Sequence, residues 1–396
     1  MRSLTLPVAF ALVSLFCHTS ALSQAPSYGE RGSELGIQVF QQVVSSKPLE
    51  NVVLSPHGVA SVLGMLLPGG HGQTRKQVLN VLQYKKNIKG PHRLLKRLHK
   101  NLTTKDAVLI ANGLFSQKGF PMLKSFVDTN KANFQTESRS MDFGHPQRAA
   151  DKINAWVSNK TKGHITSLIK PDMLDSALTR LVIVNAIYFK ALWKYRFQPE
   201  NTKMRPFTGA DGKVFKVPMM SQQSVFNIGI ANTPQQVNYR VIELPYHGNT
   251  TSMLIVLPTE EDVHLSQIIP HINTATVQSW RKLMHMRKVH LLIPKFSADV
   301  EVDLKAPLSV LGITDMFRQD KADFRHLSSE PVYVSKALQK VKIVVNEDGT
   351  KASAATTAIL MARSSPPWVS VDRPFLFLVR HNPSGTLLFM GQINQP

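Results

Sequence analysis

Apolar and β-branched residues gather in several unbroken runs that predict buried strands. The clearest runs cover residues 181–184, 253–257 and 289–293, and a proline closes each of the last two. A continuous apolar run of this length is typical of a strand that is covered on both faces of its sheet. We therefore expect these segments to lie inside large sheets.

Amphipathic patterns that predict helices lie mainly in the first half of the chain. They are found near residues 33–46, 60–67 and 148–160, where one side of each predicted helix is apolar and the other is polar. Helices and strands distributed in this way predict an α+β fold with large sheets.

Length and composition favour one globular domain. The chain has 396 residues, of which 43% are hydrophobic and 18% are charged, and this composition is ample for a packed core. It contains no Gly/Ser-rich or Pro-rich linker, no low-complexity tract and no repeat of fixed period. We expect a single domain at residues 24–396.

The first residues have the features of a secretory leader. Arg2 precedes an apolar run at residues 4–17, and small residues follow that run. This order predicts a signal peptide at residues 1–23 and a secreted, extracellular protein. The alternative is an uncleaved anchor, but the run is shorter than the ~20 residues that span a bilayer. We expect no transmembrane segment elsewhere.

Cysteine usage and sequons add to this picture. Cys17 is the only cysteine and lies in the leader, so the mature chain has neither disulfides nor a thiol nucleophile. Three Asn-x-Ser/Thr sequons, at Asn101, Asn159 and Asn249, are candidate glycosylation sites of an exported protein. Each of them could also occur by chance and stay unmodified.

The chain is strongly basic, and the excess charge is local. It has 47 Lys and Arg residues against 26 Asp and Glu, a formal net charge of +21. No acidic residue occurs in residues 51–105, and ten basic residues lie in residues 75–105. A patch of this kind predicts a polyanionic partner.

A helix that starts near Pro91 would sort this patch into two faces. Its basic face would carry Arg93, Lys96, Arg97 and Lys100, and leucines would fill the opposite face. The alternative is a merely solvated helix face, but unpaired like charges at this spacing repel one another. No aromatic residue interrupts the basic face, which disfavours nucleic acid. We expect heparin or heparan sulfate to bind here and to retain the protein at cell-surface or matrix glycosaminoglycans. Further candidates upstream are Arg75, Lys76, Lys85 and Lys86.

Motifs of catalysis are scarce. The chain has no His-Glu-x-x-His, no Gly-x-Ser-x-Gly and no phosphate loop, and its 14 histidines lack metal-ligand spacing. We therefore expect neither an enzyme nor a bound metal or cofactor. A Ser/His/Asp arrangement that is assembled only by folding stays open.

Residues 347–367 combine small side chains with a single arginine near the end. If the segment is extended, Thr350, Ala352, Ala354 and Thr356 share one uncharged face, and Lys351 points to the other side. That face could be buried in a sheet without stranding a charge, which an ordinary mobile loop does not require.

Arg363 is the one arginine of this segment, so Arg363-Ser364 is its candidate cleavage point, and two prolines follow it. A protease with an acidic specificity pocket would cut there.

Several motifs between residues 36 and 396 resemble those of the serpins. Residues 51–56 resemble the start of the family's helix B, and residues 153–165 resemble its helix F segment. Residues 181–190 resemble the central strand with its shutter asparagine, and residues 372–377 resemble the C-terminal signature.

The resemblance implies three β-sheets, about nine helices and an exposed reactive-centre loop at about residues 347–367. Arg363 and Ser364 would flank the reactive bond, and an inserting hinge would precede them. The implied mechanism is a trap, in which a protease cleaves the bond, stays covalently attached and is dragged along as the loop joins the central sheet. Implied targets are trypsin-like proteases such as thrombin, urokinase, tissue plasminogen activator, plasmin and trypsin, and heparin would accelerate their capture. The protein would be a monomer before complex formation. The hinge residues are Glu347, Gly349, Thr350, Ala352, Ala354 and Thr356.

One position departs from the family. Ser55 and Asn185 match shutter residues, but Gln339 stands where many serpins have a histidine. Glutamine can donate and accept hydrogen bonds without titrating, so a pH switch is not expected here. Two alternatives stay open: another arginine-specific serpin, similar to antithrombin or a plasminogen activator inhibitor, and a non-inhibitory carrier or chaperone serpin.

Overall fold

The computed structural model describes residues 27–84, 93–94, 96–98, 108–348 and 365–396. Its α-helices are α1 (Tyr28–Ser46), α2 (Pro56–Leu66), α3 (Gly72–Val81), α5 (Lys124–Phe134), α6 (Pro146–Lys160), α7 (Thr274–Leu283) and α8 (Lys305–Val310). Its strands are β1 (Val52–Leu54), β2 (Val108–Gln117), β3 (Glu137–Met141), β4 (Leu181–Phe189), β5 (Lys203–Thr208), β6 (Val214–Asn232), β7 (Asn238–Pro245), β8 (Thr251–Pro258), β9 (His285–Pro294), β10 (Phe296–Asp303), β11 (Val334–Val345), β12 (Trp368–Ser370), β13 (Phe375–His381) and β14 (Leu387–Ile393). The three apolar runs that predict strands lie in β4, β8 and β9, which confirms them.

Two predicted helices begin earlier than their apolar pattern does, because polar residues cap them. Ser27 Oγ accepts a hydrogen bond from the backbone N–H of Glu30, whose carboxylate accepts from the Ser27 backbone, so α1 begins at Tyr28. Ser55 caps α2 in the same way through the N–H of Gly58, and Pro56 takes the first position. Such caps satisfy the N–H groups that a helix leaves unpaired at its start.

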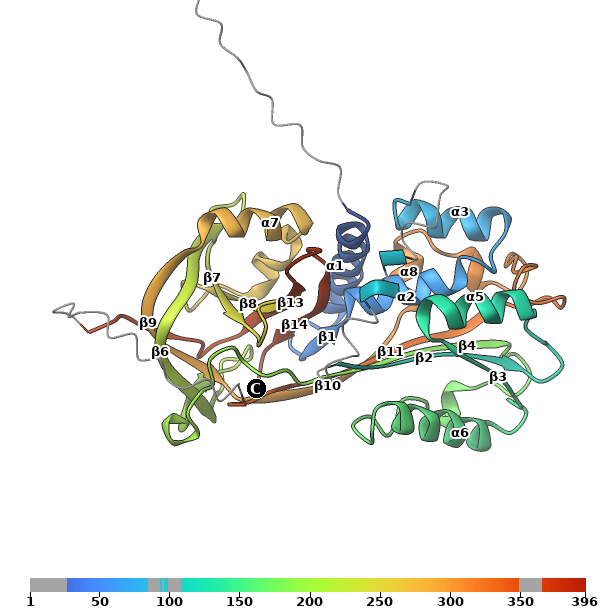
Figure 1. Cartoon of the computed structure of the whole chain (residues 1–396), viewed down its shortest axis with the longest axis horizontal. Coiled ribbons are helices and arrows are strands. Elements are labelled where there is room, and N and C mark those ends of the chain that lie inside the picture. The colour runs from blue at the N-terminus through green and yellow to red at the C-terminus, as the bar shows by residue number, and fades with distance from the viewer. Residues whose placement is uncertain (1–26, 85–92, 95, 99–107, 349–364) are drawn as a thin grey trace, which may run out of the picture.

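Five strands form a sheet in the order β10-β11-β4-β2-β3. β10 and β2 run antiparallel to β11 and β4 respectively, whereas β4 and β11 run parallel to each other. Figure 1 shows α6 against one face of this sheet and α2 and α5 against the other.

The other nine strands form a network that is continuous through β6. The first part of β6 pairs with β5 and with β9, and β9 in turn pairs with β12. The last part of β6 pairs with β7. From β7 the network runs on through β8, β13 and β14 to β1. The expected α+β fold with large sheets is confirmed. Its strands form two hydrogen-bonded networks, because the long β6 joins what the resemblance describes as two separate sheets.

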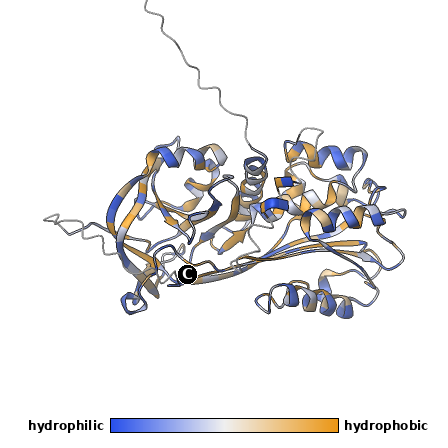
Figure 2. Cartoon of the chain, in the orientation of Figure 1, coloured by the Kyte–Doolittle hydropathy of each residue, from blue (hydrophilic) through white to orange (hydrophobic). Residues whose placement is uncertain are grey.

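Buried apolar side chains fill the spaces between these layers. One cluster lies around α1 and α2, one lies between the two strand networks, and one lies between α6 and the five-stranded sheet. Figure 2 shows the apolar positions along the strands and the polar ones on the outward sides of α3, α6 and α7. Within the described ranges, no helix has both the length and the hydropathy to cross a membrane.

Candidate functional site

β4 and β11 meet at the centre of the five-stranded sheet, and we call this pair the seam. Leu181 lies opposite Val334 at one end, and Phe189 lies opposite Ile343 at the other. The chain leaves β11 at Val345 and continues directly into the predicted reactive-centre loop. The seam is therefore the part of the sheet to which the loop is tethered.

A row of amide side chains crosses the seam on the face that α2 covers. Gln339 on β11 lies opposite Asn185 on β4, which lies opposite Asn112 on β2. Gln339 Nε2 donates to Asn185 Oδ1 at 2.9 Å, and Asn185 Nδ2 donates to Asn112 Oδ1 at 2.8 Å. All three residues are buried. Because an unpaired buried polar group costs about 1–3 kcal/mol, these bonds hold the three strands in register.

Ser55 connects this row to the start of α2. The Gln339 side chain accepts from Ser55 N at 2.7 Å and donates to Ser55 O at 3.2 Å. Ser55 Oγ donates to the Leu388 carbonyl on β14 at 2.6 Å. The structure thus brings together the predicted shutter residues Ser55, Asn185 and Gln339.

Two further residues of this site are missing from the sequence-based prediction. Asn112 interrupts an otherwise apolar part of β2, but only the strand register places it beside Asn185. Gly58 faces the same amides, and a Cβ on it would lie 2.3 Å from Asn185 Oδ1 and 2.4 Å from Gln339 Nε2. Glycine is therefore required where α2 crosses the seam.

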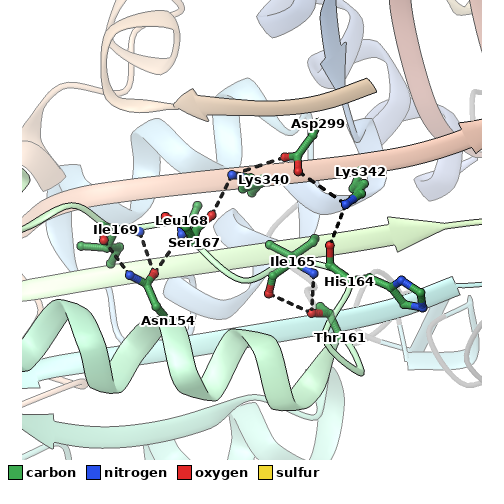
Figure 3. A network of polar contacts seen from close by, with 10 residues as sticks. All are labelled: Asn154, Thr161, His164, Ile165, Ser167, Leu168, Ile169, Asp299, Lys340 and Lys342. Carbon is green, nitrogen blue, oxygen red and sulfur yellow. Dashed lines mark hydrogen bonds and ion pairs between the residues drawn. The ribbon is translucent and has the colours of Figure 1, made fainter. Parts of the chain in front are cut away.

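The opposite face of the seam is crossed by residues 161–170, which follow α6 and which we call the strap (Figure 3). Lys340 Nζ donates to the Ser167 carbonyl at 2.7 Å, and Lys342 Nζ donates to the His164 carbonyl at 3.0 Å. Asp299 on β10 lies 3.3 Å from the first ammonium and 3.8 Å from the second. Two β11 lysines and one carboxylate thus fasten the strap to the sheet.

The strap is also bound to α6 and to β4. Asn154 on α6 donates to the Ile169 carbonyl at 2.8 Å, and its Oδ1 accepts from the backbone N–H groups of Leu168 and Ile169. The His164 ring stacks on Tyr188 of β4, with centroids 3.8 Å apart. The strap therefore contacts both strands of the seam.

Glu347 and Asp348, which we call the loop anchor, follow the end of β11. Glu347 pairs with Lys295 at 3.0 Å and accepts from the Thr202 hydroxyl at 3.0 Å. Burial opposes ionisation of Glu347, but hydrogen bonds from its own backbone, Lys295 and Thr202 outweigh burial and lower its pKa. The hydrogen bond from Lys190, at 2.9 Å, lowers the pKa of Asp348. Both carboxylates are thus held ionised where the loop begins.

The remaining predicted loop residues lie outside the described part of the chain. They are Gly349, Thr350, Ala352, Ala354, Thr356, Arg363 and Ser364. The described chain resumes at Ser365 and enters β12, which pairs in parallel with β9. The structure thus places both ends of the predicted loop.

The predicted basic surface is described in part. Arg93, Lys96 and Arg97 are helical and exposed, and Leu98 on the opposite side is buried. On α3, Lys76 is exposed, but the Arg75 guanidinium donates to the Leu67 carbonyl and so has a structural contact. Lys85, Lys86 and Lys100 lie outside the described residues.

The sequons differ in their surroundings. Asn249 is exposed in the turn between β7 and β8, with φ at 55°. Asn159 is exposed near the end of α6, but the Thr161 hydroxyl of its sequon is buried and bonded to the Val157 carbonyl and the Ile165 N–H. Asn101 lies outside the described residues. Elsewhere in the described chain, no three His, Cys, Asp or Glu side chains are grouped to hold a metal ion.

Comparisons with known proteins agree with this geometry. The family model described as serpin (serine protease inhibitor) matches residues 30–396. The chain is 53% identical to human glia-derived nexin over 100% of this chain and 98% of the relative. It is 43% identical to bovine plasminogen activator inhibitor 1, over 98% of each chain.

Solved structures give the same result. A crystal structure of native protease nexin-1 with heparin superposes with a TM-score of 0.89 at 52% identity, covering 93% of this chain and 99% of that one. Uncleaved ovalbumin superposes with a TM-score of 0.86 at 28% identity, covering 93% of this chain and 100% of that one. Residues 358–368 and 389–393 likewise resemble glia-derived nexin.

Proposed function

Because this chain belongs to the serpin family of serine protease inhibitors, we propose that it traps trypsin-like serine proteases at Arg363-Ser364. The observation that carries the proposal is the seam, a parallel strand pair whose second strand leads straight into the predicted loop. The protease serine attacks the Arg363 carbonyl carbon, and the amide bond to Ser364 breaks. The Arg363 acyl group stays on the protease, and Ser364 leaves with a new amino group.

The cleaved loop then enters the seam. A strand that follows β11 and turns back along it runs antiparallel to both β11 and β4. One parallel pair is thereby replaced by two antiparallel pairs, which are slightly more stable per residue. At ~0.5–1.5 kcal/mol per hydrogen bond, inserting about a dozen residues releases on the order of 10 kcal/mol, comparable to the stability of a whole domain. The uncut fold is then a kinetically held state.

Arg363 sets the class of target, because its guanidinium suits an acidic specificity pocket. Thrombin, urokinase, tissue plasminogen activator, plasmin and trypsin all belong to this class. The test is incubation of the purified chain with each protease, followed by denaturing electrophoresis. We expect a covalent complex that withstands denaturation, and we expect none for Arg363→Glu. An undiminished complex with Arg363→Glu would refute the assignment of the bond.

The hinge provides a matched pair of variants. Ala352→Asp places a charge on the face that enters the sheet, whereas Lys351→Asp places it on the other face. Burial of an unpaired charge slows insertion, so deacylation is completed first and the inhibitor becomes a substrate. Ala352→Asp should therefore yield mostly cleaved inhibitor, and Lys351→Asp should yield mostly complex. Equal effects would contradict insertion in this register.

Heparin or heparan sulfate is the proposed accelerating polyanion. Support comes from the exposed Arg93, Lys96 and Arg97 and from a relative's crystal structure that contains heparin. A protease bound to the same polysaccharide gains effective concentration, and the binding weakens steeply with salt.

Neutralising Arg93, Lys96, Arg97 and Lys100 together should abolish heparin acceleration and leave the heparin-free rate unchanged. Arg148 and Lys152, exposed on α6 at the other face of the five-stranded sheet, supply the matched control. If acceleration persists in the quadruple variant, Arg75, Lys76, Lys85 and Lys86 become the candidates.

We also propose that residues 24–396 form one exported monomeric domain. The match of the family model to residues 30–396 supports a single domain. Among the sequons, the exposed turn at Asn249 suits a glycan better than Asn159, whose sequon threonine is buried. Intact mass before and after glycosidase treatment of Asn249→Gln and Asn159→Gln checks this order.

A further inference from the structure

The sheet portion beside the end of the predicted loop has an unusual charge. Its strands β5, β6, β9 and β12 contain no Asp or Glu. Their basic residues are Lys203, Arg205, Lys216, Arg287 and Lys288. Successive residues of a strand face opposite sides of its sheet, so Lys203, Arg205 and Lys288 share the face of His290, and Lys216 and Arg287 lie on the other face. With three cations and no acid on these strands, the face of His290 favours an acidic partner.

An aromatic platform lies on this surface where the loop rejoins the sheet. Trp368, the first residue of β12, is 54% exposed and stacks on the His290 ring with centroids 3.6 Å apart and planes within 14°. His290 Nε2 lies 2.7 Å from Ser221 Oγ, and the His290 backbone N–H donates to the Pro367 carbonyl at 3.0 Å. The indole is thus held in one orientation while much of it faces solvent.

Arg205 completes this platform, which we define as Trp368, His290 and Arg205. Its guanidinium carbon lies 5.9 Å from the indole centroid, and its Nε is buried without a hydrogen-bond partner. Burial first, and then the Arg205 charge, lower the pKa of His290. The imidazole is therefore a neutral stacking partner, and Arg205 supplies the cation.

We propose that this platform is an exosite that docks the acidic rim of the target protease beside its active-site cleft. The proposal rests on the proposed cleavage at Arg363-Ser364. Trp368 follows Arg363 by five residues, which span at most about 18 Å. One side of a standard interface, of about 800 Å², is about 30 Å across. A protease centred on the bond therefore reaches about 15 Å from it, which brings the rim of its cleft to the platform.

The chemistry favours a protein surface over a polysaccharide. Tryptophan and arginine are the side chains that most often dominate protein interfaces. An indole already fixed by stacking loses little conformational entropy on docking. A sulfated polysaccharide would use rows of cations, whereas here a half-exposed apolar ring is the central feature.

The test measures the second-order rate of complex formation without heparin, using the protease that the chain traps fastest. Trp368→Ala should lower this rate about tenfold or more, and Trp368→Phe should retain most of it because the ring still stacks. Arg205→Gln should lower the rate at low salt and less at high salt. Val310→Ala, an exposed apolar truncation on α8, is the matched control and should change nothing.

The stoichiometry of inhibition separates docking from trapping. It should stay unchanged in Trp368→Ala, because docking precedes insertion. A Trp368→Ala rate within twofold of the parent would overturn the exosite. A loss of heparin affinity with an unchanged protease rate would assign the platform to the polysaccharide and would also overturn it. Arg363→Glu in the same assay tests the proposed function separately. If Arg363→Glu still traps the protease, the cleavage assignment fails. If Arg363→Glu no longer traps it but Trp368→Ala traps it at the parent rate, only the exosite fails.

Discussion

The two faces of the seam are closed by different chemistry. On the α2 face, Gln339 and Asn185 are fully buried and bonded to one another. On the strap face, Lys340 and Lys342 keep 16% and 29% of their side chains exposed and bond to backbone carbonyls. A buried amide network leaves orphaned groups when one member is lost, whereas a partly solvated ammonium can be replaced by water. The α2 face therefore governs the stability of the fold, and the strap governs how readily the seam opens.

Among the variants that test this contrast, Gly58→Ala should cause the largest loss of folding stability. The added Cβ would enter the space of the Asn185 and Gln339 amides, at 2.3 and 2.4 Å. Because both amides are buried and bonded, we expect more than about 4 kcal/mol to be lost from the free energy of unfolding. Chemical denaturation measures it. Gly70→Ala, whose Cβ would meet atoms no closer than 3.5 Å, is the control. A loss below about 1 kcal/mol for Gly58→Ala would contradict the packing described for α2.

Gln339→Ala should cause the second largest loss of folding stability. It leaves Ser55 N and Asn185 Oδ1 without their bonds to this side chain, at 2.7 and 2.9 Å. Orphaned buried groups cost about 1–3 kcal/mol each, so we expect roughly 2–4 kcal/mol of destabilisation. Thermal and denaturant unfolding of the variant and the parent protein, under the same conditions, measure this loss. A nearly neutral result would mean that the α2 face does not hold the seam closed.

On the strap face, Lys340→Gln and Lys342→Gln should each cost only about 1 kcal/mol. Their larger effect should be on a rate: a looser strap allows the protein to lose its inhibitory activity faster when it is incubated at about 37 °C. Lys336→Gln is a matched control, because Lys336 is on the same strand and pairs with Asp303 at 3.6 Å. If Lys336→Gln shortened the active lifetime as much as Lys340→Gln, the strap contacts would not be responsible.

The loop anchor should give the smallest effect, visible through pH. The pKa of Glu347 is lowered in the folded protein, so its stabilisation is fully present above the unfolded value of about 4.3. It is lost as pH falls through the lower folded pKa. Glu347→Gln should therefore cost under about 1 kcal/mol at pH 7, and its difference from the parent should shrink at low pH. Unfolding curves at several pH values test this, and a difference that grows on acidification would contradict it.

Sequence reasoning found the strands and the outline of the site, but not all of its contacts. Apolar runs predict β4, β8 and the last part of β9, because the residues of these runs are almost all buried. The resemblance to serpins indicates Ser55, Asn185 and Gln339. Asn112 was not predicted as a site residue, because its contact with Asn185 depends on the register of β2 with β4, which is a tertiary feature. In the sequence, Lys340 and Lys342 look like outward-facing lysines of a strand. Only the folded structure shows that the strap crosses their face of the sheet (Figure 3).

The central claim is that β4 and β11 must separate for a protease to be trapped. Val182 and Lys336 are register partners across the seam, and neighbouring strands are close enough for a disulfide. A Val182→Cys/Lys336→Cys variant would lock the seam. Ser297→Cys/Val344→Cys is the matched control, because it links β10 to β11, which stay together.

Covalent complex formation with trypsin, before and after reduction, is the measurement. Oxidised seam-locked protein should be cleaved at Arg363-Ser364 without forming a complex that withstands denaturation, and reduction should restore the complex. The β10–β11 control should trap trypsin in both states. If the oxidised seam-locked protein traps trypsin as well as that control does, the seam does not open and the account of the mechanism is wrong.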